Sequence, residues 1–380
     1  MATAVVRLVL SCEGSDPQGT YADAIREASE VLERGGLVAF PTETVYGLGA
    51  RADHAGAMGR LRAVKSREPN KAFTVHIAAR EDAARFVPGI GGLAGRFVRK
   101  GWPGPLTLVM TVDDPSSAPV MVGRNGAAAE AMYYDHTIGL RCPDDGVAQR
   151  LLRAVDAPIV AASANLAGNP PPRSGAEVLR DLDGRIDLLI DSGRTKYAKP
   201  STIVRVTGSS YEVVREGVYD AGIVERLSTV RLLFVCTGNT CRSPMAAGLA
   251  EQMLAERLGC KPSELRARGV VVQSAGTGGG TGGASPHAIK VMAQRGIALS
   301  DHVSTALSAE VIQQSDYIFA MMRTHRDTIV QMVPAAESRV MLLLGNEDVR
   351  DPMGGAEKDY ERCAQTVERG LRTRLQEVIV

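Results

Sequence analysis

The stretch Val235-Cys236-Thr237-Gly238-Asn239-Thr240-Cys241-Arg242-Ser243-Pro244 decides the fold of the second half of this 380-residue chain. It follows an apolar run at residues 230–235 that has the length of a buried strand. An Ala/Met/Leu-rich helical pattern begins at Pro244, with Ser243 placed as its cap. The stretch therefore predicts a strand, a short loop and a helix, in that order.

The composition of this loop suits the binding of phosphate and nucleophilic attack on it. Backbone N–H groups at a helix N-terminus, together with the helix dipole, form an anion-binding concavity. The same field and the neighbouring Arg242 favour the nucleophilic thiolate form of Cys236. The planar guanidinium of Arg242 can bind two phosphoryl oxygens at once. We expect the rest of the cradle to be Thr237, Gly238, Asn239, Thr240, Cys241 and Ser243. The alternative is a buried structural cysteine beside a helix cap.

Transfer of a phosphoryl group also requires an acid for the leaving group. Asp351 is the candidate, in the loop Asp351-Pro352-Met353-Gly354-Gly355 that follows an apolar run at residues 340–344. A residue before proline is held extended, so the Asp351 carboxyl can project over a pocket. Taken alone, the same letters also fit an ordinary turn aspartate.

Residues from 230 to the C-terminus resemble the low-molecular-weight protein tyrosine phosphatase family. The resemblance rests on residues 236–243, on Ser274-Ala275-Gly276 and on Asp351-Pro352. It implies that Cys236 forms a phosphocysteine intermediate, that Arg242 binds the phosphate, and that Asp351 protonates the leaving group and later activates water. It implies no metal. It also implies that Cys241 can bond the nucleophile under oxidation, with simple packing as the alternative.

Two features resemble the bacterial protein-arginine phosphatase branch of that family. One is the polar Thr240, where tyrosine phosphatases usually carry a bulky aliphatic residue, and the other is Met353-Gly354-Gly355, where they carry aromatic residues. A guanidinium leaving group favours a polar partner and a carboxylate over an aromatic sandwich. We therefore expect phosphoarginine as substrate. Phosphotyrosine is the direct alternative, and arsenate reduction is a third.

The first half of the chain places polar residues near the ends of predicted strands. An apolar strand at residues 37–40 runs into a turn at 41–49 rich in hydroxyls and glycine, where backbone can approach a ligand closely. The cations and hydroxyls downstream suit a polyanion such as a nucleotide, although a solvated surface explains any one of them. These residues are Lys65, Arg67, Lys71, Arg141, Ser163, Asn165, Ser201 and Arg215.

Residues 15–220 resemble the YrdC-like family, the threonylcarbamoyl-AMP synthases of tRNA modification. The blocks that carry the resemblance are Pro41-Thr42-Glu43-Thr44-Val45-Tyr46-Gly47-Leu48 and Trp102-Pro103-Gly104-Pro105-Leu106-Thr107. The resemblance implies condensation of L-threonine, bicarbonate and ATP, with Mg²⁺ accompanying the ATP. The product, threonylcarbamoyl-adenylate, would supply N6-threonylcarbamoyladenosine at position 37 of tRNA.

The same resemblance assigns roles to single residues. It implies that Thr42, Tyr46 and His76 face threonine, and that the eight cations and hydroxyls named above hold the triphosphate and adenylate. His76, in a strand-like run at residues 73–77, is equally compatible with a buried core histidine. The alternative for the whole molecule is a phosphatase whose first half is a non-catalytic module that binds nucleotide or RNA.

The global composition sets limits on partners and location. The net charge of +1 gives no large basic excess, so we expect tRNA to be met through a tRNA-modification transferase partner or a local patch that binds double-stranded RNA. Six cysteines without paired metal spacing predict a reducing compartment. The apolar stretches are too short for a membrane span, and no signal-peptide pattern opens the chain, so we expect a cytoplasmic protein.

The order of the predicted elements indicates an α/β protein with two domains. Strand-like runs at residues 37–40, 106–111, 158–161 and 202–206 alternate with helical patterns. We expect a YrdC-like domain with a twisted mixed sheet at residues 1–217, a linker at 218–229 with one helical turn as an alternative, and a phosphatase domain at 230–380. The latter should have a small parallel sheet with its site at the strand carboxyl ends.

Overall fold

The computed structural model describes residues 2–7, 20–68, 71–124, 126–279 and 281–378, which fall into two compact units, Met1–Leu227 and Ser228–Val380. The segment expected to be a linker carries helix α7 (Ala221–Ser228). Its Val224 is fully buried in the core of the first unit, and Leu227 packs against that core. Because this helix has an apolar face to bury, the boundary between the units falls at its C-terminal end, between Leu227 and Ser228, and not before it.

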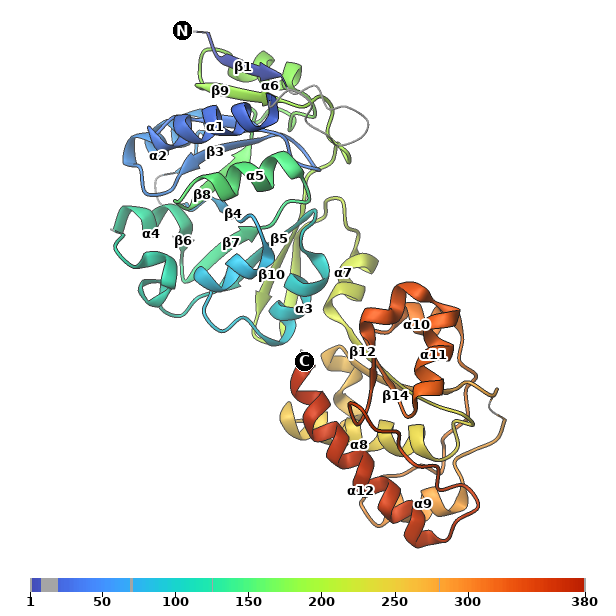
Figure 1. Ribbon diagram of the computed structural model, residues 1–380. Helices are drawn as coiled ribbons and strands as arrows, with labels where there is room; N and C mark the ends of the chain where they lie inside the picture. Colours follow the sequence, from blue (N-terminus) through green and yellow to red (C-terminus); the bar gives the residue numbers. More distant parts are fainter. Residues whose placement is uncertain (1, 8–19, 69–70, 125, 280, 379–380) are drawn as a thin grey trace. The chain divides into compact units, whose positions relative to one another are not determined.

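The first unit is built on one mixed sheet of eleven strands among the described residues (Figure 1). Parallel and antiparallel neighbours alternate irregularly: β9 is parallel to β1 and β2, whereas β8 is antiparallel to β3 and β4. This confirms the mixed sheet expected from the sequence. From one edge to the other the order is β1 (Ala4–Arg7), β9 (Leu188–Asp191), β2 (Val38–Phe40), β3 (Gly47–Arg51), β8 (Ile159–Ser163), β4 (Thr74–His76), β7 (Thr137–Arg141), β5 (Leu106–Thr111), β10 (Thr202–Thr207) and β11 (Ser210–Arg215), and β6 (Tyr133–Tyr134) pairs with β7.

Helices cover this sheet and bury its apolar side chains in two clusters. One cluster gathers Leu32, Phe40 and Leu151, where helices α1 and α5 pack against each other. The other includes Leu61, Phe97 and Leu108. Strand β2 is apolar and buried throughout because it is covered on both faces. The helices before α7 are α1 (Thr20–Glu33), α2 (Ala55–Lys65), α3 (Gly92–Gly101), α4 (Gly126–Met132), α5 (Gly146–Ala154) and α6 (Gly175–Leu182).

The second unit has a small, fully parallel sheet, as expected. Its order is β13 (Val270–Gly276), β12 (Val230–Cys236), β14 (Tyr317–Ala320) and β15 (Val340–Leu342). Side chains of β12 alternate between its two faces. Phe234 stacks on Phe319 at a ring distance of 5.2 Å in one core, whereas Leu233 and Val235 lie in the core on the other face.

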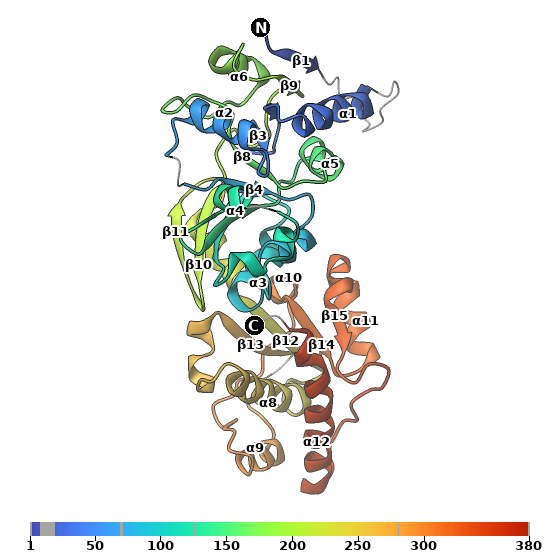
Figure 2. The ribbon, with the colours of Figure 1, turned by 90° about the vertical axis from the view of Figure 1, so that its left-hand side faces the viewer.

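The described residues of the second unit also form five α-helices. Of these, α8 and α12 lie side by side (Figure 2). Their bounds are α8 (Arg242–Arg257), α9 (Pro286–Ala293), α10 (Ala309–Gln314), α11 (Arg323–Met332) and α12 (Glu357–Arg374). Helix α12 buries Tyr360, Val367 and Leu371 and is otherwise rich in charged residues. Within the described residues, no helix combines the length and the apolar character needed to cross a membrane.

Candidate functional sites

The loop that the sequence predicts to bind phosphate, residues 237–241, lies between the end of strand β12 and the start of helix α8, and it is called the phosphate loop below. The helix begins at Arg242, with Cys241 as its N-cap. The prediction that Ser243 caps a helix beginning at Pro244 is therefore wrong. Proline is tolerated in the first turn because the N–H groups there lack intrahelical partners, so the two residues before it can be helical. Ser243 is buried in that turn, with its hydroxyl 2.9 Å from the sulfur of Cys236.

The sulfur of Cys236 lies at the bottom of the loop, facing hydrogen-bond donors. The backbone N–H of Asn239 donates to it over 3.2 Å, and the Ser243 hydroxyl lies on another side. The sulfur therefore lies among hydrogen-bonding groups just before the N-terminus of helix α8.

Asn239 holds the loop in a conformation that few residues adopt. Its φ of 55° lies in the left-handed region, which asparagine tolerates better than most side chains. Its amide nitrogen donates to the hydroxyls of Ser243 and Ser274, each over 2.8 Å, and its amide oxygen accepts from the N–H of Thr305 at 2.8 Å. These bonds offset the cost of the conformation and keep the loop N–H groups fixed.

Arg242 and Asp351 meet at the mouth of the loop. The Arg242 Nη2 is 2.5 Å from the Asp351 Oδ2, and the Arg242 Nη1 donates to the carbonyl of Val349 over 3.3 Å. The arginine side chain is 3% exposed, whereas that of Asp351 is 43% exposed. The structure thus brings together a cysteine at the end of β12, a buried cation and a carboxyl group that is partly exposed.

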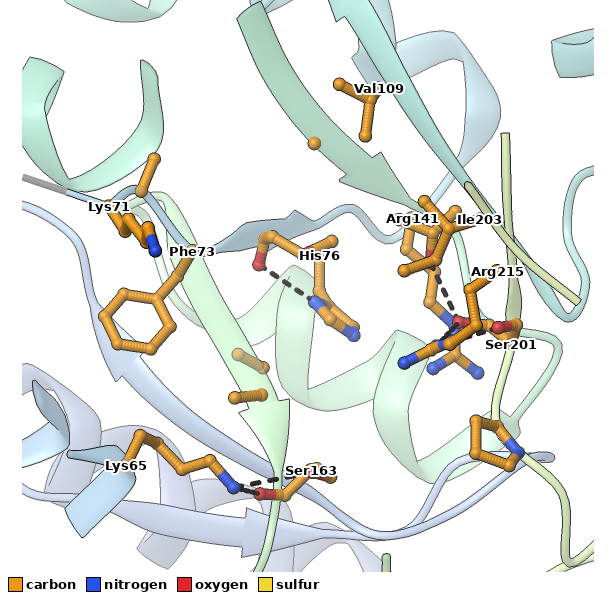
Figure 3. Close-up of a pocket in the computed structure, with 18 of the residues that line it drawn as sticks. Lys65, Lys71, Phe73, His76, Val109, Arg141, Ser163, Ser201, Ile203 and Arg215 are labelled. Carbon is orange, nitrogen blue, oxygen red and sulfur yellow. Dashed lines mark hydrogen bonds between the residues drawn. The ribbon is translucent and has the colours of Figure 1, made fainter. Parts of the chain in front are cut away.

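The first unit contains a cavity of about 510 Å³ whose wall carries the predicted cations. Figure 3 shows Lys65 beside Ser163 on one side, Arg141 and Arg215 near Ser201 on the other, and His76 between the two groups. Arg67 and Lys71 also line the cavity. Residues from β4, β7, β8, β10 and β11 and from the end of α2 thus meet at a single site.

Lys65 is held in place by oxygen atoms from the end of β8 and from the residues that follow it. Its Nζ donates to the carbonyls of Ser163 and Asn165 over 2.9 and 2.7 Å, and to the Asn165 Oδ1 over 3.0 Å. Burial, and then the charge of Arg67, lower the pKa of Lys65 to about 8. The ammonium group therefore has a fixed position on the cavity wall.

Two arginines are fixed on the opposite wall. Arg215 Nη2 donates to the Ser201 carbonyl over 2.8 Å, and burial, followed by the charge of Arg141, lowers the pKa of Arg215. Arg141 Nη2 donates to the hydroxyl of Thr44 over 2.6 Å and lies 3.1 Å from the Glu43 carboxylate. Two fixed guanidinium groups in a partly buried site favour an anionic ligand.

Comparison with known proteins assigns both units to families. The Sua5/YciO/YrdC family model, which is described as telomere recombination, matches residues 30–217, and the model of the low molecular weight phosphotyrosine protein phosphatases matches residues 231–379. The threonylcarbamoyl-AMP synthase of Chromohalobacter salexigens is 35% identical over 183 residues, which cover 48% of this chain and 92% of that protein. The chain is a fusion of these two families.

Two other relatives show how much of each protein is shared. The threonylcarbamoyl-AMP synthase of Pyrococcus abyssi is 31% identical over 226 residues, which cover 59% of this chain and only 63% of that protein. The solved structure of the YwlE arginine phosphatase from Geobacillus stearothermophilus is 34% identical, with a TM-score of 0.33, and the match covers 39% of this chain and 96% of that one. The first unit is called the synthase unit below, and the second the phosphatase unit.

Most predicted ligand residues of the synthase unit line its cavity, but Thr42 and Asn165 do not. Thr42 is buried behind the wall, where its hydroxyl donates to the carbonyl of Val45 and accepts from Arg141. Asn165 holds Lys65. These two residues therefore support other wall residues in this structure.

Tyr46 and His76 line the cavity as well as being buried. The Tyr46 hydroxyl donates to the Gly193 carbonyl over 2.8 Å and accepts from the Ser192 N–H, and burial raises its pKa to about 12. Burial, and then the charge of Arg141, lower the pKa of His76 to about 3. His76 is thus a buried, uncharged histidine that also lines the cavity, so it is compatible with both sequence-based expectations: a residue that faces threonine and a core histidine.

Arg67 and Lys71 lie at the more open side of the synthase cavity. The guanidinium of Arg67 stacks over Phe73 at 4.7 Å from the ring centre and donates to the Ala72 carbonyl. Lys71 forms an exposed ion pair with Glu68 at 3.0 Å. Exposed pairs of this kind are weak, so Lys71 is free to change partner.

The sequence did not single out Glu43 or His325. Glu43 is buried beside Arg141, and neither of its carboxylate oxygens has a hydrogen-bond donor within the described part of the chain. Its position between two threonines in a motif block was the only available signal. His325, on helix α11, lies 2.9 Å from the Thr237 hydroxyl, and nothing in the linear sequence connects these residues.

The residues of the synthase cavity do not form a magnesium site of their own. No aspartate or glutamate is among its lining residues, and the described part of the chain has no cluster of three or more metal-binding side chains. Magnesium prefers carboxylate, phosphate and water oxygens. An ion that accompanies ATP would therefore have to be held by phosphate and water, and no step is assigned to it.

Proposed function

We propose that the synthase unit condenses L-threonine, bicarbonate and ATP into threonylcarbamoyl-AMP and pyrophosphate. The observation that carries this proposal is a cavity of about 510 Å³ whose wall, within the described part of the chain, has five cationic side chains and no carboxylate. The cations are Lys65, Arg67, Lys71, Arg141 and Arg215. Such a wall suits a triphosphate, and the similarity to threonylcarbamoyl-AMP synthases supports this reaction.

Catalysis in this unit is proposed to rest on positioning and charge. Cations fixed by hydrogen bonds, such as Lys65 and Arg215, offset negative charge as pyrophosphate leaves, without having to reorganise. Holding the reactants together supplies much of the rate. Among the residues described, the cavity wall has no cysteine. The Lys65 Nζ lies 3.5 Å from the Ser163 hydroxyl but donates to the carbonyls of Ser163 and Asn165. The Ser201 hydroxyl pairs with that of Thr107, so no covalent enzyme intermediate is proposed. Transfer of the product to tRNA is assigned to a partner enzyme in the cytoplasm.

Pyrophosphate release tests this proposal. We expect release that requires both threonine and bicarbonate, and that falls by about 10²-fold or more in Lys65→Met, which removes a fixed cation. The matched control is Arg205→Met, because Arg205 lies on the nearby strand β10 and pairs with Glu212 at the surface. ATP binding without any pyrophosphate release would instead support a non-catalytic nucleotide-binding module.

We propose that the phosphatase unit hydrolyses phosphoarginine in proteins through a phosphocysteine intermediate. The observation that carries this proposal is the convergence of the Cys236 sulfur, Arg242 and the accessible Asp351 on one loop. The thiolate forms a bond to phosphorus as the P–N bond breaks, and Asp351 gives its proton to the departing nitrogen. Water then attacks phosphorus, Asp351 takes the proton, and Cys236 leaves as thiolate.

The preference for arginine rests on the mouth of the loop. Thr240 presents a hydroxyl there, 3.5 Å from the Cys241 sulfur, and Met353 is 64% exposed where an aromatic slot would need a ring. A polar hydroxyl and a carboxylate suit a guanidinium group. Phosphotyrosine is the alternative substrate.

The substrate is tested with phosphoarginine and phosphotyrosine peptides. We expect the wild type to prefer phosphoarginine, Thr240→Ile to shift the preference toward phosphotyrosine, and Cys236→Ser to be inactive on both. A phosphotyrosine preference that does not respond to Thr240 would place the unit with the ordinary tyrosine phosphatases.

A further inference from the structure

A buried histidine contacts the phosphate loop but has no part in the reaction proposed above. His325, near the start of helix α11, is 3% exposed. Its Nε2 lies 2.9 Å from the Oγ1 of Thr237, and its Nδ1 has no hydrogen-bond partner among the described residues. Burying a polar atom without a partner costs free energy of folding. The contact of Nε2 with Thr237 is therefore the polar interaction that this histidine gains in return.

Thr237 lies where a bound phosphoryl group would meet Arg242. It directly follows the nucleophile in sequence and is exposed at the mouth of the loop. Its Oγ1 lies 3.4 Å from the Arg242 Nη2, which is the nitrogen that also pairs with Asp351. Any oxygen that binds this side of Arg242 therefore comes close to the Thr237 hydroxyl.

The hydrogen-bonding capacity of a hydroxyl determines the direction of these bonds. A threonine hydroxyl has two lone pairs and one proton, and arginine can only donate, so Arg242 occupies one lone pair. A neutral His325 with its proton on Nε2 uses that N–H in a bond to Thr237, whereas a proton on Nδ1 would be buried without an acceptor. The Nε2–H then occupies the second lone pair. The proton of Thr237 is left to donate to a ligand.

The surrounding charges keep the ring neutral. The charged groups that face it are Arg242 on α8 and the carboxylates Asp348 and Asp351 in the loop after β15. Burial, and then the charge of Arg242, lower the pKa of His325 to about 4, against a smaller opposing effect of the two carboxylates. The ring is therefore uncharged near neutral pH, as the choice of tautomer requires.

We propose that His325 is a positioning residue that fixes the Thr237 hydroxyl as a hydrogen-bond donor to a phosphoryl oxygen held by Arg242. The inference rests on the proposed phosphatase function and adds a donor to its phosphate cradle. It predicts that His325 and Thr237 act as one unit in phosphate binding.

The test uses inorganic phosphate as probe and the alkylation of Cys236 by iodoacetamide as readout, in the full chain. Mass spectrometry of the loop peptide gives the phosphate concentration that half-protects the thiol, and this does not require turnover. We expect His325→Leu and Thr237→Val each to raise that concentration roughly tenfold, as for a lost hydrogen bond to a charged ligand. The double variant should be no worse than either single one, because the two residues serve the same bond.

Two variants separate positioning from damage to the fold. His325→Gln, whose amide can donate from a similar place, should restore most of the phosphate affinity. Thr328→Val changes a half-buried residue on the same helix, whose hydroxyl donates to the Thr324 carbonyl within that helix, and should match the wild type. Equal protection in wild type and His325→Leu would overturn the inference, and so would losses that multiply in the double variant. If the His325 dependence is found but no phosphorylated peptide is hydrolysed, the proposed function fails and this inference stands.

Discussion

Gly276 is the position where one added methyl group should damage the phosphatase site most selectively. It ends strand β13, opposite Cys236 on β12. A Cβ built there would lie 2.6 Å from the Thr237 carbonyl oxygen, and 3.0 Å from the Asn239 nitrogen and the Gly238 carbonyl carbon. All three atoms belong to the backbone of the phosphate loop, so no side chain can rotate away to make room.

The size of the effect follows from these distances. Ordinary contact begins at 3.4 Å, so the Thr237 carbonyl must move by about 0.8 Å (3.4 minus 2.6 Å). A misplacement of about 1 Å in a catalytic site costs about 10²-fold in rate. We therefore expect Gly276→Ala to lower kcat/KM for a phosphorylated peptide by about 30- to 100-fold. Crowding of this kind destabilises a domain by about 1–3 kcal/mol, so the phosphatase unit should still fold.

Gly278→Ala is the matched control. A Cβ there would lie 3.3 Å from the same Thr237 carbonyl oxygen and 3.5 Å from the Cγ2 of Thr237. The loop therefore has to move by only about 0.1 Å to reach an ordinary contact distance. We expect kcat/KM within about threefold of the wild type, the range of ordinary surface changes. The measurements are steady-state hydrolysis and thermal unfolding of the wild type, Gly276→Ala and Gly278→Ala. If Gly276→Ala keeps wild-type kcat/KM, or if both variants lose activity equally, the steric argument is refuted.

Three other outcomes follow from the same structure. Asp351→Asn should lower kcat by about 10²- to 10⁴-fold because the proton donor is lost. The same change should tighten the binding of inorganic phosphate, because Arg242 loses the carboxylate that competes with phosphate. Weaker protection of the Cys236 thiol by phosphate would contradict this. Because the folded pKa of His76, about 3, lies below its unfolded value of about 6.5, protonation favours unfolding, and stability should fall as pH drops from about 6.5 to 3. Urea unfolding should show a loss of roughly 4 kcal/mol over that range that is absent in His76→Leu. Glu43→Gln, which leaves the buried Arg141 without a counter-charge, should destabilise the synthase unit by about 3 kcal/mol; an unchanged unfolding midpoint for that unit would show that the pair contributes nothing.

Strand positions were predictable wherever apolar runs were long and bounded by turns. Strand β5 spans Leu106–Thr111, as predicted, and β12 extends one residue beyond the predicted 230–235 run. Strand β15 ends at Leu342, two residues before the apolar run at 340–344 ends. Val340 and Leu342 face one core, whereas Leu343 is buried in the other core and Leu344 packs against it. Apolarity reports burial, and burial does not require a strand.

Helix α7, at the end of the synthase unit, was not predicted from the sequence as a docked helix, although its apolar side chains pack on the first core. Residues 218–229 are expected to form a short connector, with one helical turn as an alternative, yet helix α7 has eight residues and buries Val224 in the first core. So short an apolar pattern does not identify a docked helix without the surface that receives it.

The sequence by itself determined the phosphate loop, because its parts are neighbours in the chain. Cys236 and Arg242 are six residues apart, and a strand, a turn and a helix start allow few arrangements of such a segment. The synthase cavity is different, since Lys65 meets its partners Ser163 and Asn165 across 98 and 100 residues. Only the folded sheet decided that Thr42 and Asn165 support the wall, that Glu43 pairs with Arg141, and that His325 reaches Thr237. Contacts between distant residues depend on strand order and packing, which a motif does not encode.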